Sequence, residues 1–188
     1  DGRPLPKETK KQRKFYKRAI RSGYNYQGMS RLCVMYTSTV LLRKECLNKI
    51  GLFDPDMKAF EDWDFYLRFT LKYNIGTILE SLVRFRIHKA HTTQDEFIEA
   101  RIKLSLKHLA IIQPFDNFPL RKRVCCNFYM HLANTYYIAM DTGNTGKYTI
   151  EALKLNPLVL FWPNFEFRLL TTLLFPHFMN KLRGRNLY

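Results

Sequence analysis

Cysteine is scarce in this chain of 188 residues, and the spacing of the cysteines argues against a zinc-binding protein and against a disulfide-rich protein. The four cysteines form no C-x-x-C pair, and the adjacent two would point in different directions on a helix. They are Cys33, Cys46, Cys125 and Cys126. Neither a zinc site nor a disulfide framework is expected. No N-x-S/T acceptor occurs, and DGRPLPKETKK at the amino end has no apolar signal core, so we infer reduced thiols in the cytoplasm.

A long uninterrupted apolar run is also missing. Residues 158–179, LVLFWPNFEFRLLTTLLFPHFM, have the length of a membrane span, but prolines and polar residues interrupt them. This pattern excludes a lipid-exposed span and fits two alternatives, a segment lying in a membrane interface and a packed pair of helices. The inner face of the membrane is therefore the alternative, peripheral location for a cytoplasmic chain.

Acidic residues are few, since 16 Asp and Glu stand against 31 Lys and Arg, a formal charge of +15. Such a surface attracts phosphates, nucleic acid or anionic lipid. Residues 7–22 alone hold eight basic residues and one acid. We interpret them as a solvated helix in preference to a nucleic-acid arm, because no aromatic stacking pattern accompanies them. A non-catalytic module that docks on anionic membrane or nucleic acid is the alternative function.

Hydrophobic residues are plentiful, at 46% of the chain, and aromatic residues reach 15%. The β-branched and aromatic run at 33–42 predicts a strand with hydroxyls in its middle. A helix over 43–51 should end at Gly51, and another should run from Glu61 to about Tyr73. Two short strands are expected at 75–80 and 82–88. This succession predicts an α/β fold for residues 1–94.

The periodicity changes after about residue 94. Three amphipathic helical stretches are expected at 95–113, 121–140 and 145–157, broken by Pro114, Pro119, Gly143 and Pro157. We therefore predict that residues 95–188 form a separate α-helical extension, which is a candidate for membrane association.

The stretch FEDWDFYLRF, residues 60–69, crowds three acids among aromatic rings. On a helix, Glu61, Asp64 and Arg68 share a stripe that we expect to face water, and Asp64 can pair with Arg68. Asp62 lies off this stripe and shares its side with Tyr66 and other rings. Two interpretations are open for Asp62, a first-turn acid that complements the helix dipole and a general base.

The stretch LVRFRIH, residues 82–88, places Arg84, Arg86 and His88 on one face if it is a strand. This ladder fits contact with a diphosphate or a metal diphosphate, and the alternative is a solvated strand face. His88 and His91 could also be a metal pair, on a weakly specific signal.

Taken in order, G-x-F-D at 51–54, E-D-W-D at 61–64 and R-x-H at 86–88 resemble the second half of inverting glycosyltransferases of family 2, over roughly residues 1 to 93. The resemblance implies the second half of a GT-A fold, that of nucleotide-diphospho-sugar transferases. It also implies transfer of a hexose, with inversion, from a nucleotide-diphosphate sugar to a hydroxyl of a saccharide or lipid-linked acceptor. Synthesis of a cell-envelope polysaccharide is the expected setting.

The resemblance also implies a role for each matching residue. Asp62 would be the catalytic base, and His88 would meet a divalent cation, Mg²⁺ or Mn²⁺, or the donor diphosphate. The implied substrate-binding residues are Glu61, Trp63, Ser38, Thr39 and Arg86. Residues 89–93 would form the loop that closes over the nucleotide. The family's donor-binding half, with its D-x-D, does not precede Asp1, so the resemblance implies a carboxy-terminal fragment that lacks most of the donor site.

Overall fold

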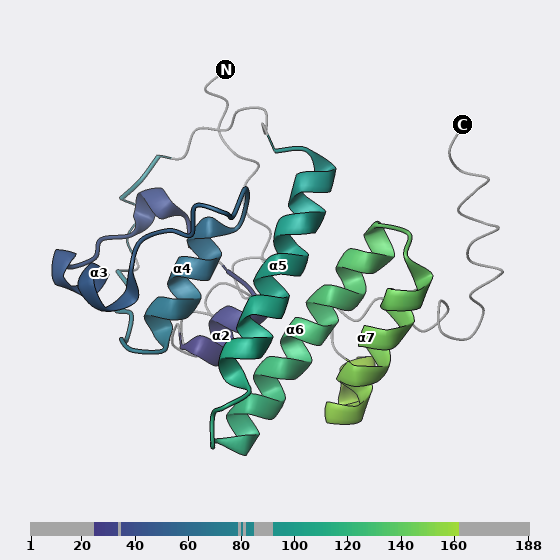
Figure 1. Ribbon diagram of the computed structural model, residues 1–188. Coiled ribbons are helices and arrows are strands. Elements are labelled where there is room, and N and C mark those ends of the chain that lie inside the picture. The colour runs from purple at the N-terminus through teal and green to yellow at the C-terminus, as the bar shows by residue number, and fades with distance from the viewer. Residues whose placement is uncertain (1–24, 34, 79, 81, 85–91, 162–188) are drawn as a thin grey trace. The chain divides into compact units, whose positions relative to one another are not determined.

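The computed structural model describes residues 25–33, 35–78, 80, 82–84 and 92–161. The chain divides into two compact units, residues 1–93 and residues 94–188, and each is described by itself. All regular elements of the described residues are helical (Figure 1). The expected α/β class, as half of a GT-A fold, is therefore wrong for the part of the chain that the structure describes.

The predicted strand at 33–42 is replaced by extended chain around a 3-10 turn, η1, Thr37–Thr39. The hydroxyl run explains this turn, because the hydroxyl and the amide of Thr39 both donate to the Tyr36 carbonyl, at 2.7 and 2.8 Å. Such side-chain bonds compete with a sheet ladder. The described residues of the expected strands at 75–80 and 82–88 form no ladder either. Residues 79, 81 and 85–88 lie outside the described part.

The first unit contains α2, Tyr26–Arg31, α3, Lys44–Ile50, and α4, Glu61–Thr70. Helix α3 ends at Gly51 with φ 81°, a left-handed conformation that glycine adopts without strain, and this confirms the predicted end. The predicted start of α4 at Glu61 is confirmed as well, although the helix ends at Thr70, before Tyr73.

Helix α4 is anchored through its buried side against α2. The Trp63 indole nitrogen donates to the Met29 carbonyl of α2 at 2.7 Å, and both residues are buried. Phe65, Tyr66 and Leu67 are buried beside them. Burial of each large side chain contributes about 1.5–3 kcal/mol, so the first turn of α4, which carries the acids, is held in a defined place.

The second unit contains α5, Gln94–Ile112, α6, Phe118–Ile138, α7, Thr142–Leu155, and a short 3-10 turn η2, Pro157–Phe161. These confirm the three predicted helical stretches. Pro119 and Gly143, expected between helices, instead lie in the first turns of α6 and α7, after caps at Asn117 and Asp141. A first-turn proline loses no hydrogen bond, because the amide there has no partner within the helix.

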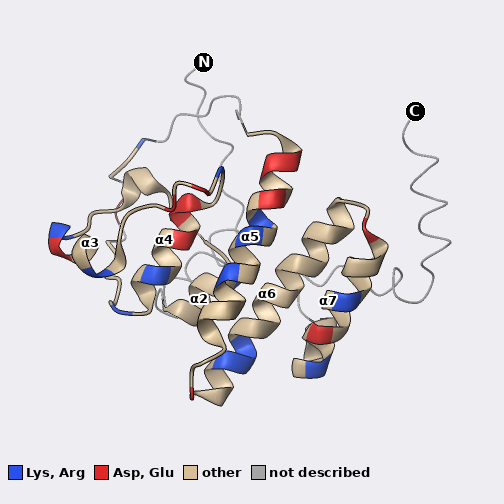
Figure 2. Cartoon of the chain, viewed as in Figure 1, with Lys and Arg blue, Asp and Glu red and all other residues tan. Residues whose placement is uncertain are grey.

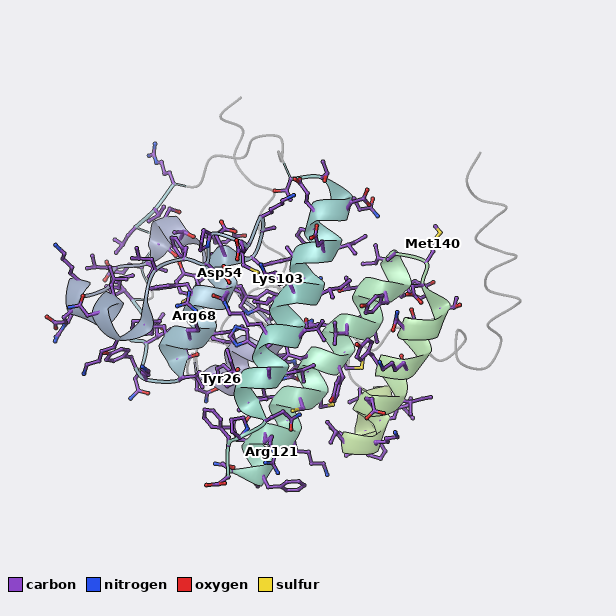
Figure 3. The ribbon with its side chains drawn as sticks, viewed as in Figure 1. Tyr26, Asp54, Arg68, Lys103, Arg121 and Met140 are labelled. Atoms are coloured by element: carbon purple, nitrogen blue, oxygen red, sulfur yellow. The ribbon has the colours of Figure 1, made fainter. Side chains whose placement is uncertain are left out.

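Helix α6 packs against α5 on one side and α7 on the other (Figure 1). The residues that fill these contacts have little or no exposure: Leu104, Ile112, Val124, Phe128, Leu132, Cys126, Met130, Ala133 and Ala152. Met140 projects from the turn between α6 and α7 (Figure 3). Among the helices in the described residues, none has the length and apolar character needed to cross a membrane.

Candidate functional site

The amino end of α4 begins under backbone strain. Phe60 has φ 61° and ψ 17°, a left-handed conformation that is uncommon for a residue with a side chain, and no side chain caps the helix there. Such a conformation costs about 1–2 kcal/mol and often occurs at functional sites. The acids of the first turn follow directly, as Figure 2 shows by the red residues of α4.

Asp64 has a structural role, as a buried partner of Arg68. Its Oδ2 accepts from Arg68 Nε at 2.8 Å, so the predicted pair is confirmed. The expectation that this stripe faces water is wrong, because Asp64 is fully buried. Arg68, labelled in Figure 3, also donates to the carbonyls of Ile50, the last residue of α3, and of Leu52, two residues later. That segment shields the pair from solvent.

The polar atom of Trp63 is also engaged within the fold. Its indole N–H donates to the Met29 carbonyl, and its ring contacts the Phe60 ring edge to face at 5.7 Å between centroids. Only 4% of Trp63 is exposed, and Glu61 is half-buried. Their implied places on the acceptor side remain predictions.

Asp62 differs from its acidic neighbours in what it contacts. Its Oδ1 accepts from the Trp63 amide at 2.7 Å, and its Oδ2 accepts from the Thr37 hydroxyl at 3.3 Å. The second distance is long for a bond between a hydroxyl and an oxygen, which is usually near 2.7–2.8 Å. Thr37 lies on the exposed turn η1, and Asp62 is half-buried. The carboxylate therefore faces a weakly held hydroxyl at an accessible edge.

Two further groups complete this cluster. Burial raises the pKa of Tyr66, a hydrogen bond with the Thr37 side chain opposes the rise, and the charge of Asp62 adds to it. Burial likewise raises the pKa of the Cys33 thiol to about 11, with a smaller contribution from Asp62. Both groups hold their protons at neutral pH. Tyr66 and Cys33 are thus neutral neighbours of Asp62, whose own hydrogen bonds come from the Thr37 hydroxyl and the Trp63 amide.

The structure brings only some of the predicted site residues together. Ser38 and Thr39 are exposed on η1, but Thr37 is the residue that meets Asp62. Arg86 and His88 lie outside the described residues, so their roles and the metal remain predictions. Within the described part, no group of three or more His, Cys, Asp or Glu residues could hold a metal ion.

Thr37, Tyr66 and Cys33 were not predicted as site residues. The four-residue spacing of Asp62 and Tyr66 was the available signal, since it places both on one side of a helix. Comparison with protein-family models, curated proteins and solved structures finds no match. Function is therefore inferred from the chemistry of these residues and from the short motifs of the sequence.

Proposed function

We propose that this chain acts in the inverting transfer of a sugar from a nucleotide-diphosphate donor to a hydroxyl acceptor, with Asp62 as the general base. The observation that carries the proposal is the 3.3 Å approach of the Thr37 hydroxyl to Asp62 Oδ2. An acceptor hydroxyl that displaced this long bond would meet the same oxygen. The resemblance of the G-x-F-D and E-D-W-D motifs to family 2 glycosyltransferases supports this class of reaction.

In the proposed step, the acceptor oxygen attacks the anomeric carbon while its proton passes to Asp62. The bond between that carbon and the diphosphate oxygen breaks, and the nucleoside diphosphate leaves. A positioned base contributes about a hundred- to ten-thousand-fold in rate. A divalent cation, expected from the family at His88, would stabilise the charge of the leaving diphosphate.

The test measures nucleoside diphosphate released by this chain from UDP-glucose, UDP-N-acetylglucosamine or GDP-mannose in the presence of Mn²⁺. We expect Asp62→Asn to lower the rate about a hundred- to ten-thousand-fold with donor affinity kept. Asp56→Asn is the matched control, because Asp56 is an exposed aspartate of the same unit. Full activity in Asp62→Asn, or no release from any of these donors by the unaltered chain, would contradict the proposal.

The basic segment at residues 7–22 favours the alternative, a module that binds anionic surfaces without catalysis. Such binding should weaken steeply with added salt, because it releases counterions. It should also be unchanged in Asp62→Asn. Binding of a single-stranded oligonucleotide or of phosphatidylglycerol vesicles with both properties, and no sugar transfer, would favour this alternative.

A further inference from the structure

The two ends of the second unit carry different charges. Helices α5 and α6 run antiparallel and α7 turns back beside α6, so the start of α5 lies at the same end as the turn between α6 and α7 (Figure 1). Arg101 Nη2 of α5 lies 3.1 Å from His131 Nδ1 of α6 toward this end. We call residues 94–100 and 136–146 the acidic end, because they include no Lys or Arg. They contain four acids, Asp95, Glu96, Glu99 and Asp141. Figure 2 shows acids in red at the start of α5.

The opposite end of this unit is rich in cations. Val159 of η2 belongs to one buried cluster with Cys126 of α6, so the close of α7 lies beside the start of α6. We call residues 113–123 and 151–161 the basic end. They contain four cations and two acids: Arg121, Lys122, Arg123, Lys154, Asp116 and Glu151. A negatively charged surface therefore attracts the basic end, repels the acidic end and orients the unit.

Large apolar side chains project at both ends. Phe118 and Leu158 at the basic end are 58% and 65% exposed, and Met140 at the acidic end is 49% exposed. At the basic end alone such side chains have cations beside them, because the exposed Lys122 and Arg123 lie one turn after Phe118 on α6. Apolar side chains bordered by Lys and Arg are the pattern of surfaces that lie on an anionic bilayer.

The exposed ring of Phe118 is held in a defined position. The Arg121 guanidinium lies over this ring at 5.6 Å from its centroid and donates to the carbonyls of Gln113 and Phe115, at 3.1 Å each. The Asn117 side chain caps the same helix start by accepting from the Leu120 amide at 3.0 Å. The turn before α6 therefore presents Phe118 from a fixed backbone, which lowers the ordering cost of binding.

We propose that the basic end docks on an anionic lipid bilayer, with Phe118 and Leu158 inserted at the headgroup level and Lys122 and Arg123 against lipid phosphates. A bilayer is inferred in preference to a nucleic acid because it offers an apolar layer that can bury a leucine beside the cations. The tract at 158–179, for which a membrane interface is one of two predicted locations, begins at this same end. The docking depends neither on the role proposed for Asp62 nor on residues 7–22.

The first test measures cosedimentation of the full chain with vesicles of phosphatidylglycerol and phosphatidylcholine. Lys122→Gln/Arg123→Gln should weaken binding about 5-fold for each cation removed, because each charge lies at the anionic surface. Arg43→Gln/Lys44→Gln is the control, since it removes the same charge from exposed positions at the start of α3, and its effect should be much smaller. An equal loss in the two double variants, or no binding of the unaltered chain, overturns the proposal. Loss of oligonucleotide binding without loss of vesicle binding in Lys122→Gln/Arg123→Gln would overturn it in favour of a nucleic acid.

The second test compares apolar side chains at the two ends. Phe118→Ala/Leu158→Ala should weaken vesicle binding about 10-fold, because it removes the inserted groups without changing the charge. Ile138→Ala/Met140→Ala is the matched control, since it truncates two exposed apolar side chains at the acidic end, and it should bind as the unaltered chain does. Equal binding by the two double variants would refute insertion of the basic end.

The third test reads the orientation directly. In a Trp162→Phe background, lipids brominated near the headgroup should quench the fluorescence of Phe118→Trp more strongly than that of Met140→Trp. Trp63 contributes the same emission to both proteins, so the difference reports the two new positions. Equal quenching of the two proteins on vesicles that bind them would show that the basic end does not face the bilayer.

Discussion

Arg68 in the first unit and Arg101 in the second are both partly shielded guanidinium groups on helices, yet their partners differ. Arg68 donates to the buried Asp64 carboxylate and to the carbonyls of Ile50 and Leu52. Arg101 donates to a neutral imidazole and retains a buried Nε without a partner. An arginine whose charge and donors are balanced within the chain stabilises the fold. One that is not balanced leaves a buried donor unsatisfied, which is destabilising.

The starts of α4 and α7 show the same contrast for carboxylates. Asp141 accepts from the Asn144 amide at 2.9 Å and from the Asn144 side chain at 2.7 Å, so it serves as the cap of α7. Helix α4 has no such cap and begins at the strained Phe60. Asp62 instead directs one oxygen at a hydroxyl on another segment. The first carboxylate stabilises a helix end, whereas the second contacts a hydroxyl of another segment, which is the contact on which our proposed function rests.

The largest effect on the free energy of unfolding is expected when the ion pair between Asp64 and Arg68 is broken. Arg68→Met leaves Asp64 buried without its cation and removes two bonds to the end of α3, so it should cost about 3–5 kcal/mol in the free energy of unfolding. Urea unfolding followed by tryptophan fluorescence measures this change in a Trp162→Phe background, in which Trp63 is the one remaining tryptophan. Arg43→Met is the control, because Arg43 is exposed and its weak ion pair contributes little. A cost below about 1 kcal/mol would remove the distinction between Arg68 and Arg101.

Replacing Arg101 by methionine should not lower the free energy of unfolding, in contrast to Arg68→Met. Arg101→Met replaces a desolvated charge by an apolar side chain of similar length, so we expect unchanged stability or a gain of about 1–2 kcal/mol. Thermal unfolding measures the difference. A loss as large as that of Arg68→Met would contradict this expectation and would indicate that an acid of the chain balances Arg101, although no carboxylate contributes to the shift in its pKa.

Local sequence patterns predicted much of this structure. The end of α3 at Gly51, the start of α4 at Glu61 and the pairing of Asp64 with Arg68 all depend on residues within a turn or two of one another. The three helices of the second unit follow from periodicity in the same way. These features are set by short-range geometry, which the sequence displays directly.

The predictions were wrong where the structure depends on contacts between residues that are far apart in the sequence. Asp64 was expected to face water, but the chain at residues 50–52 covers it through bonds to Arg68. The run of three hydroxyls was interpreted as the middle of a strand, whereas the Thr39 hydroxyl bonds the Tyr36 carbonyl and the run forms a 3-10 turn. Arg101 and His131 are thirty residues apart and meet only across two helices. Periodicity within one helix does not show such contacts.

Acidification should test the capping role of Asp141 at the start of α7. Hydrogen bonds from Asn144 hold the pKa of Asp141 below its ordinary value of 3.8. The stabilisation is therefore present above about pH 4 and is lost as the pH falls through the lowered pKa. Asp141→Asn keeps the cap without the charge, so the unaltered chain should exceed it by about 0.3–1 kcal/mol at neutral pH and match it near pH 2. Hydrogen exchange of the α7 amides measures this, and a difference independent of pH would contradict the capping role.

A comparably small effect is expected from the backbone strain at Phe60. Phe60→Gly and Phe60→Ala both lose the ring contact with Trp63, so the stability difference between them reports the left-handed backbone alone, and glycine should be favoured by about 0.4–1 kcal/mol. Met140, with φ 62° at an exposed turn of the second unit, is the matched control and should show the same gap. If the strain at Phe60 helps to position Asp62, Phe60→Gly should also slow release of the nucleoside diphosphate relative to Phe60→Ala, whereas the Met140 pair should leave that rate unchanged. Equal rates for the two Phe60 variants would show that this strain has no part in the proposed chemistry.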